Sequence, residues 1–299
     1  MPNTVNYATQ FGSILRELYG QRLTSDDLFH SNEDIQIING KDLKIPDLTV
    51  SGYKDHSRGG DFNTGSISNT YQLVTLDHDR DIEFGVDPMD VDETNKVVAV
   101  ANIHSRFEHT QAIPELDCYT YSKLYAEAVR AGVVVDTTAL TVANILGKLD
   151  DDMVALADAG VPLDRVILYC TPAVKKLLKN ADGIQRQLNV SDGGGIDRRV
   201  HTLDDIRKIQ EVPSARFMTA FDFTNGYKKA ATGKQINYIL IDPEAQVSRV
   251  KYSYIKMFEP GSDSRTNDRY LYQNRRYNGT FAIDSLIKTG CRINAVATA

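Results

Sequence analysis

Residues 51–69, SGYKDHSRGGDFNTGSISN, form a long glycine-rich stretch with almost no large aliphatic side chains. A structureless segment of this length is uncommon inside a compact domain. Short alternations of apolar and polar residues flank it, with Leu43 and Ile45 before it and Tyr71 and Leu73 after it. We therefore predict a two-stranded arm with this stretch at its tip. An isolated hairpin is only marginally stable in water, so the arm needs a partner surface.

An amphipathic helix is expected ahead of the arm, from Tyr7 to Tyr19. Its apolar residues have the spacing i, i+3, i+4 and i+7 and form one stripe: Phe11, Ile14, Leu15 and Leu18. A helix this short cannot bury such a stripe on itself. We therefore expect it to dock on the body of its own chain or on a neighbouring chain.

A strand and two helices are expected between the arm and Gly132. Alternation predicts the strand, at Ile82, Phe84 and Val86. Capping-box spacing of Asp90 and Glu93 predicts the start of the first helix, which continues through Val100, Ile103 and Phe107. Pro114 suits the first turn of the second helix, where Glu115 and Asp117 would lie near its positive end, and Gly132 ends it.

The run VILYC at residues 166–170 predicts a buried strand. Thr171 and Pro172 suit the cap and first turn of a helix that follows it directly. Another helix, over residues 142–157, should precede the strand. This unit indicates an α/β domain that extends to about Ile241.

After Pro243 the alternation is again that of β structure. Asn278-Gly279 is the strongest short hairpin signal in the chain, with Phe281 and Ile283 on its far side. We therefore predict a β-turn at these two residues.

Charge is unevenly distributed along this chain of 299 residues, whose net charge is −6. Residues 77–93 hold eight acidic residues against Arg80 alone, a net charge of −7. Residues 249–276 hold seven basic residues against three acidic ones, a net charge of +4. Two solvated faces are one interpretation, and the one we favour for an isolated domain. Attraction between the two stretches on different chains is the other, and it would steer association more than it adds affinity.

No motif indicates a catalytic, cofactor or metal centre. Asp77, Asp79 and Asp81 imitate the start of a calcium-binding loop, but Ile82 stands where such a loop needs glycine and Pro88 where it needs glutamate. An irregular calcium site stays open. The three cysteines are far apart and form no CxxC pair: Cys118, Cys170 and Cys291. We therefore predict a protein that is not an enzyme and that uses no cofactor or metal.

No apolar run approaches the roughly 18–20 residues that cross a bilayer, and the N-terminus does not have the pattern of a signal peptide. We therefore expect synthesis in the cytosol and no membrane partner.

Four stretches, in this order, resemble a known family: KDLKIPDLTVSGYKDHSRGG at 41–60, DHDRDIEFGVDPMDVDET at 77–94, IPELDCYTYSKLYAEA at 113–128 and VILYCTPAVKKLL at 166–178. Over nearly its whole length the chain resembles the major capsid proteins of tailed bacteriophages, which have the Hong Kong 97-like fold. The resemblance implies a mixed α+β chain with an N-terminal arm (1–34), an extended loop with flanking strands (35–90), a peripheral domain with a long spine helix (91–135 and 246–299) and an axial domain (136–245).

The resemblance also implies a self-assembling subunit of the virion. Pentamers and hexamers would close an icosahedral capsid around double-stranded DNA, without sequence-specific binding, after synthesis in the cytoplasm of the host bacterium. A separate scaffolding protein and a portal are the other expected partners. Candidate interface residues are Phe11, Ile14, Leu15, Leu18, Lys54, Arg58, Asp79, Asp81, Arg275 and Arg276. Two alternatives stay open: an encapsulin-type nanocompartment shell and a soluble α/β enzyme.

In the namesake of the family, a lysine of the extended loop is joined covalently to an asparagine of a neighbour's peripheral domain. Lys54 is the one lysine between residues 46 and 95, and it lies beside Asp55 in a polar stretch. A solvated lysine amine is protonated at neutral pH and therefore unreactive. We predict a shell held by non-covalent contacts, although two asparagines are available as acceptors, Asn274 and Asn278.

Overall fold

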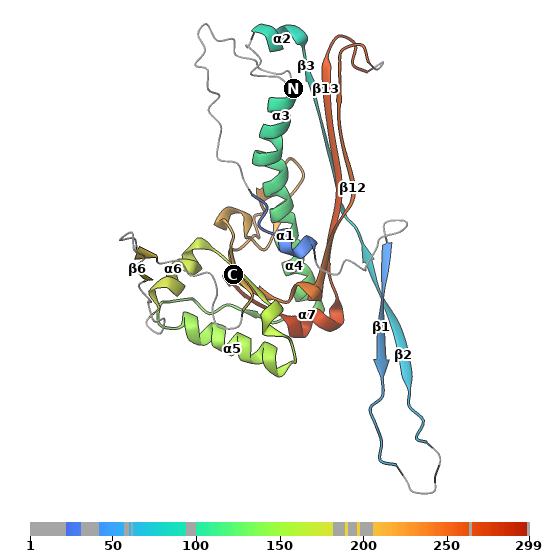
Figure 1. Cartoon of the computed structure of the whole chain (residues 1–299), viewed down its shortest axis with the longest axis vertical. Coiled ribbons are helices and arrows are strands. Elements are labelled where there is room, and N and C mark those ends of the chain that lie inside the picture. The colour runs from blue at the N-terminus through green and yellow to red at the C-terminus, as the bar shows by residue number, and fades with distance from the viewer. Residues whose placement is uncertain are drawn as a thin grey trace.

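The computed structural model of the chain consists of a tall sheet with a long helix beside it, a lower α/β part, and a two-stranded arm that extends away from both (Figure 1). It describes residues 22–30, 42–56, 60, 62–93, 100–181, 189–190, 196–197, 206–262 and 265–297. Five of the predicted interface residues lie outside these ranges: Phe11, Ile14, Leu15, Leu18 and Arg58. The predicted helix at 7–19 lies outside them as well.

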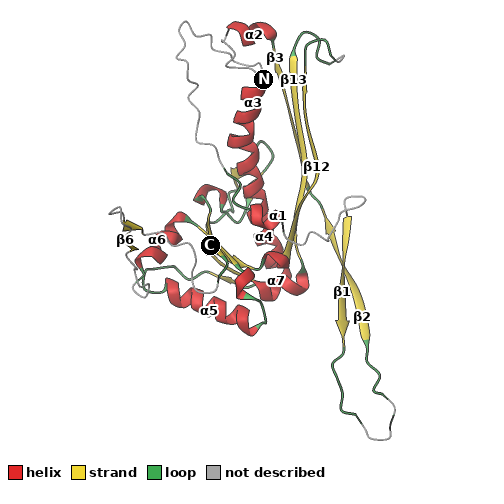
Figure 2. Ribbon diagram, viewed as in Figure 1, coloured by secondary structure: helices red, strands yellow, loops and turns green. Residues whose placement is uncertain are grey.

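The arm is formed by β1 (Asp42–Val50) and β2 (Ile67–Thr75), which pair antiparallel along their whole length. This confirms the predicted two-stranded arm, which Figure 2 shows extending from the body. Pro46 lies inside β1, where it has no N–H to donate. The position is tolerated because β1 has no strand partner besides β2 among the described residues.

The tall sheet has three antiparallel strands in the order β12 (Gln246–Phe258), β13 (Tyr270–Ala282), β3 (His78–Val86). The predicted turn at Asn278-Gly279 is wrong, because both residues lie inside the central strand β13. Glycine is required there for packing, since a Cβ on Gly279 would overlap the buried side chain of Leu76. The strands β12 and β13 are joined instead through residues 259–269, where Gly261 and Asn267 adopt positive φ angles of 76° and 45°.

Residues 100–131 are helical without interruption, through α3 (Val100–Phe107), a π-helical turn (Glu108–Ala112) and α4 (Ile113–Ala131). The predicted start of a separate helix at Pro114 is therefore wrong, although the predicted end at Gly132, with φ 97°, is confirmed. Proline inside a helix leaves the carbonyl four residues earlier without its amide donor. Here that carbonyl belongs to Thr110, and the hydroxyl of Tyr227 donates to it at 3.4 Å.

The short helix α2 (Pro88–Glu93) precedes this long helix. Its first turn is capped by Asp87, whose Oδ1 accepts a hydrogen bond of 2.9 Å from the N–H of Met89. The predicted capping role of Asp90 is wrong, because Asp90 lies inside the helix.

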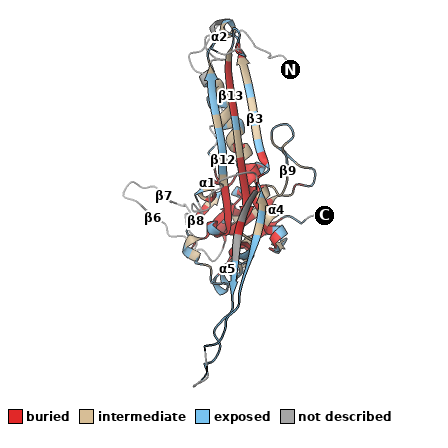
Figure 3. Ribbon diagram, turned by 90° about the vertical axis from the view of Figure 1, so that its right-hand side faces the viewer, coloured by how far each residue is buried: buried red, intermediate tan, exposed pale blue. Residues whose placement is uncertain are grey.

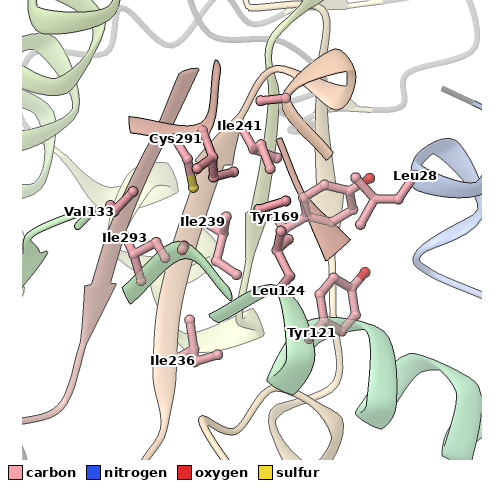
Figure 4. Packing of buried hydrophobic residues seen from close by; sticks show 14 of the residues in the cluster. Leu28, Tyr121, Leu124, Val133, Tyr169, Ile236, Ile239, Ile241, Cys291 and Ile293 are labelled. Carbon is pink, nitrogen blue, oxygen red and sulfur yellow. The ribbon is translucent and has the colours of Figure 1, made fainter. Parts of the chain in front are cut away.

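The lower part is a five-stranded sheet in the order β4 (Val135–Asp136), β14 (Cys291–Ala295), β11 (Ile236–Ile241), β5 (Ile167–Cys170), β8 (Lys208–Glu211). Side chains alternate between its two faces. Tyr169, Ile239 and Ile241 pack toward α4 with Tyr121 and Leu124 (Figure 4). Leu168 and Leu240 pack on the other face, against α5 (Ile145–Asp158) and α6 (Pro172–Asn180).

The predicted strand and its following helix are confirmed by β5 and α6. The hydroxyl of Thr171 accepts the N–H of Val174 at 3.3 Å and caps α6.

The domain boundaries stay a prediction. We note that β14 follows α7 (Asp284–Gly290) in the range expected to be peripheral, yet it pairs with β11 and β4. The remaining elements are short: α1 (Asp26–Phe29), β6 (Asn189–Val190), β7 (Ile196–Asp197), β9 (Phe221–Asp222), β10 (Lys228–Lys229) and 3-10 turns at Leu163–Arg165, Ser214–Arg216 and Pro243–Ala245. Within the described ranges, no helix is both long and apolar enough to span a membrane.

Candidate assembly surfaces

The arm has one apolar face that its own chain leaves in solvent. Directly opposed residues of antiparallel strands share a face, and the face alternates along each strand. The pairs Leu48–Asn69 and Val50–Ile67, with Tyr71 and Leu73, therefore lie on one face. Their apolar side chains are 62% to 76% exposed: Leu48, Val50, Ile67, Tyr71 and Leu73. Figure 3 shows the arm as an exposed extension of the molecule.

The opposite face of the arm packs on the body at its root. Ile45 is buried there, and together with Val74 it contacts a small cluster that includes Val247 and Phe281. Beyond the root this face is polar, with Thr49, Ser68 and Thr70. The arm is therefore amphipathic, and its apolar face is directed away from the body that anchors it.

Gln72 fixes the direction of the arm. Its Nε2 donates to the carbonyl oxygen of Ala282 at 2.7 Å and to Oδ1 of Asp284 at 3.0 Å. Its Oε1 accepts the N–H of Asp284 at 3.1 Å. Arg130 of α4 binds the same carboxylate through two hydrogen bonds, of 2.6 and 3.1 Å. The arm, β13 and the long helix therefore meet at one hydrogen-bonded junction.

The described N-terminal segment is anchored by Asp117 of α4. This carboxylate is fully buried and accepts hydrogen bonds from the backbone and hydroxyl groups of Thr24 and Ser25, at 2.8 to 3.2 Å. Arg216 donates to it at 2.8 Å. The expected role of Asp117 near a helix N-terminus is wrong, because the helix begins well before it. The sequence contains one signal for this anchor: Asp117 lies one helical turn before Tyr121, next to the apolar residues of α4.

The two oppositely charged stretches lie in the same sheet: the acidic stretch contains β3, and the basic stretch contains most of β12 and the start of β13, which pairs with β3. Arg275 donates to both carboxylate oxygens of Asp79, at 3.0 and 2.6 Å, and its Cα is paired in register with that of Asp81. Arg276 donates to Glu108 of the long helix at 2.7 Å. Both arginines therefore have acidic partners within their own chain, and attraction between these stretches on different chains stays a prediction. Asp81 remains exposed.

The groups named for a covalent cross-link lie in different surroundings. Lys54 is exposed near the tip of the arm, where its Nζ lies 3.5 Å from the carbonyl oxygen of Thr64. Asn274 and Asn278 are each only 4% exposed, and Nδ2 of Asn274 donates to Glu108 at 2.7 Å. Both candidate acceptors are therefore enclosed by their own chain.

The carboxylates that imitate a calcium loop do not converge. Asp77 accepts hydrogen bonds from Tyr119 and Lys123, at 2.7 and 2.6 Å, whereas Asp79 pairs with Arg275. In the part of the chain that the structure describes, no three His, Cys, Asp or Glu side chains are grouped so as to hold a metal ion. Burial raises the pKa of Cys170 and Cys291 to about 12, so both remain thiols at neutral pH.

Comparison with known proteins places this arrangement in a known fold. No protein-family model matches the chain, and no curated protein sequence does. Among solved structures, a chain from Mycobacterium phage Che8 is 14% identical with a TM-score of 0.63, and the match covers 97% of each chain. A chain described as "Capsid structure of the Cyanophage P-SCSP1u" is 14% identical with a TM-score of 0.64, over 98% of this chain and 93% of that one.

A chain of the "Asymmetric unit of bacteriophage PhiM1 mature capsid" is 12% identical with a TM-score of 0.65, and the match covers 99% of this chain and 93% of that one. Full-length matches at such low identity mean that the arm, the tall sheet, the long helix and the α/β part share their arrangement with these phage structures. The chain therefore has the phage capsid fold that its sequence predicts.

Proposed function

We propose that this protein is the major capsid subunit of a tailed bacteriophage. Copies of it assemble as pentamers and hexamers into an icosahedral shell that encloses double-stranded DNA. The observation that carries the proposal is the exposed apolar face of the arm. A buried aliphatic or aromatic side chain contributes about 1.5–3 kcal/mol relative to an exposed one, so covering this face favours association. The arm extends away from its own body, which leaves a second copy as the cover (Figure 1).

The proposal includes the other partners that a phage shell uses. A separate scaffolding protein directs assembly, a portal occupies one vertex, and the finished subunit resides in the virion. DNA is enclosed without sequence-specific recognition. A net charge of −6 supports this, because the chain as a whole carries no excess of positive charge for tight binding of a polyanion.

The test is a variant that changes only the exposed face, Tyr71→Ser with Leu73→Ser. Both side chains are more than 60% exposed, so the subunit should fold as before, with unchanged circular dichroism and urea midpoint. Shell formation in the presence of the phage's scaffolding protein should be lost. The matched control changes the polar face of the same strand, Ser68→Ala with Thr70→Ala, and should assemble normally.

Electron microscopy of the wild-type particles separates the proposal from its alternatives. Shells with a portal and DNA support it, shells filled with protein cargo support an encapsulin-type compartment, and small particles under every condition contradict both. Normal assembly of the Tyr71→Ser, Leu73→Ser variant would contradict the role assigned to the arm.

A further inference from the structure

The dipeptide Asn-Gly occurs three times in the chain, at residues 39–40, 225–226 and 278–279. The first pair lies outside the described residues, and the other two lie in opposite surroundings. Asparagine is one of the thermolabile residues of proteins. It is most reactive before glycine, because the backbone nitrogen of the next residue can attack the side-chain amide and glycine has no Cβ to obstruct the approach. The surroundings therefore decide which of the two asparagines reacts.

Asn225 is open to this reaction. It is exposed and lies in the turn between β9 and β10, at the tip of the hairpin of residues 221–229. Within the described part of the chain, neither the side-chain amide of Asn225 nor the N–H of Gly226 forms a hydrogen bond. No atom lies within 4 Å of the place that a Cβ on Gly226 would occupy. The two reacting groups are therefore free to approach each other, and water reaches both.

Asn278 is protected from it. It is 4% exposed and lies in β13, which pairs with β12 on one side and with β3 on the other. Strand pairing holds the backbone extended, and the side chain of Leu76 fills the space beside Gly279. The nitrogen of Gly279 could reach the amide only if the sheet opened locally. The chain thus contains one reactive Asn-Gly pair and one matched unreactive pair.

We propose that Asn225 is a site of spontaneous deamidation. The N–H of Gly226 loses its proton to water or hydroxide, and the nitrogen forms a bond to Cγ of Asn225. The bond between Cγ and the side-chain nitrogen breaks, and ammonia leaves with the returned proton. Water then opens the resulting succinimide ring at either carbonyl and yields aspartate or isoaspartate. One water is consumed and one ammonia is released, with no oxidation or reduction.

Deamidation changes the way the hairpin is held on the molecule. The ring of Phe223 lies 5.2 Å from a histidine ring of β3, and the hydroxyl of Tyr227 donates to a carbonyl of the long helix. Isoaspartate adds one carbon atom to the main chain between these two anchors. Both products add a negative charge next to Gly226, whose carbonyl oxygen accepts a hydrogen bond from Arg80. The reaction therefore alters the contact of the hairpin with the tall sheet and the long helix.

Trypsin provides the test, because it releases each Asn-Gly pair in a peptide of its own. Residues 217–228 and 277–288 each contain one asparagine and no glutamine. The folded, unassembled full-length subunit is kept for several days in warm, mildly alkaline buffer, and its peptides are compared by mass spectrometry with a digest taken at the start. Residues 217–228 should gain the mass difference between –NH2 and –OH and separate into two products of equal mass, aspartate and isoaspartate. Residues 277–288 should stay unchanged.

Two controls isolate the role of the fold and that of the ring. The same two peptides, incubated after digestion, should both deamidate, because neither is then held in a sheet. Asn225→Gln should stop the gain in residues 217–228, because its longer side chain would have to close a larger ring. Equal gains in the two peptides from the folded subunit, or no gain in residues 217–228, would overturn the proposal. The inference goes beyond the proposed function and needs only the single chain, so a failure to form shells would overturn the proposed function alone.

Discussion

Arg216 donates a hydrogen bond of 2.8 Å to the carboxylate of Asp117, and both residues are at least 95% buried. The pair joins the loop before β9 to the long helix, and the same carboxylate holds Thr24 and Ser25. An ion pair enclosed in this way is balanced only while both partners are present, because an isolated buried charge loses its hydration without compensation.

Replacing Arg216 by Met should therefore lower the free energy of unfolding of the unassembled subunit by about 3–5 kcal/mol. Urea unfolding followed by circular dichroism measures the change. Lys208→Met is the matched control, because Lys208 is 43% exposed in its pair with Asp27. An exposed pair contributes about 0–1 kcal/mol. Equal effects of the two substitutions would contradict the structural importance of the buried pair.

Acid should destabilise the subunit through His78. Its ring stacks on Tyr119 at 4.0 Å, and Arg80, Asp77, Asp79 and Glu115 surround it. Burial, followed by the charge of Arg80, lowers the pKa of His78 to about 4. In the unfolded chain the pKa of this histidine has its ordinary value near 6.5. Between the two pKa values, the ring is therefore protonated in the unfolded chain and neutral in the folded one. Stability is therefore complete above pH 6.5 and is lost as the pH falls toward 4.

Between pH 7 and pH 5 the contribution of His78 should fall by about 2 kcal/mol. His78→Phe keeps the ring stacking and should remove this part of the pH dependence, as measured by urea unfolding at the two pH values. His56→Phe, at an exposed position of the arm, should leave the dependence unchanged. An unaltered pH profile for His78→Phe would show that other groups cause the acid sensitivity.

Where a local signal and the tertiary structure agree, the sequence predicts the fold well. VILYC followed by Thr171-Pro172 specifies a buried strand and a capped helix because each cue acts within a few residues. The arm was predictable for the same reason, since glycine-rich residues separate two alternating runs. The exposed face of the arm was less evident, because Leu48 and Tyr71 become neighbours on one face only once the register is known.

The failures come from tertiary contacts that override local rules. Asn278-Gly279 is a strong turn signal, but the glycine is used to admit Leu76. Pro114 normally starts a helix, but a π turn and the hydroxyl of Tyr227 allow it inside one. The pairing of Asp79 with Arg275 spans 196 residues, so no local pattern reveals that the two charged stretches lie in the same sheet.

Gly279→Ala should therefore destabilise the subunit by about 1–3 kcal/mol, the range for overpacking a core. The added methyl group would displace Leu76, which is 4% exposed. Gly52→Ala is the control, because no atom lies within 4 Å of its added Cβ. The double variant with Leu76→Ala should lose less free energy of unfolding than the sum of the losses of the two single variants, because the new methyl group enters the space that leucine vacates. Full additivity in urea unfolding would contradict the proposed contact.

Mature particles should be held by non-covalent contacts, so that boiling in denaturant gives one subunit band near 33.3 kDa. A covalent cross-link would have to join the amine of Lys54 to the side-chain amide of an asparagine, and neither group is in a suitable environment. Lys54 is exposed, and a hydrated lysine amine is protonated and unreactive at neutral pH. Asn274 is enclosed and bound to Glu108, and Asn278 is equally buried, so an amine from a second subunit has no open path to either amide. Gel electrophoresis under reducing conditions measures the outcome. A ladder from dimers to hexamers that disappears in Lys54→Ala would contradict the prediction and would mean that assembly opens the sheet around these asparagines.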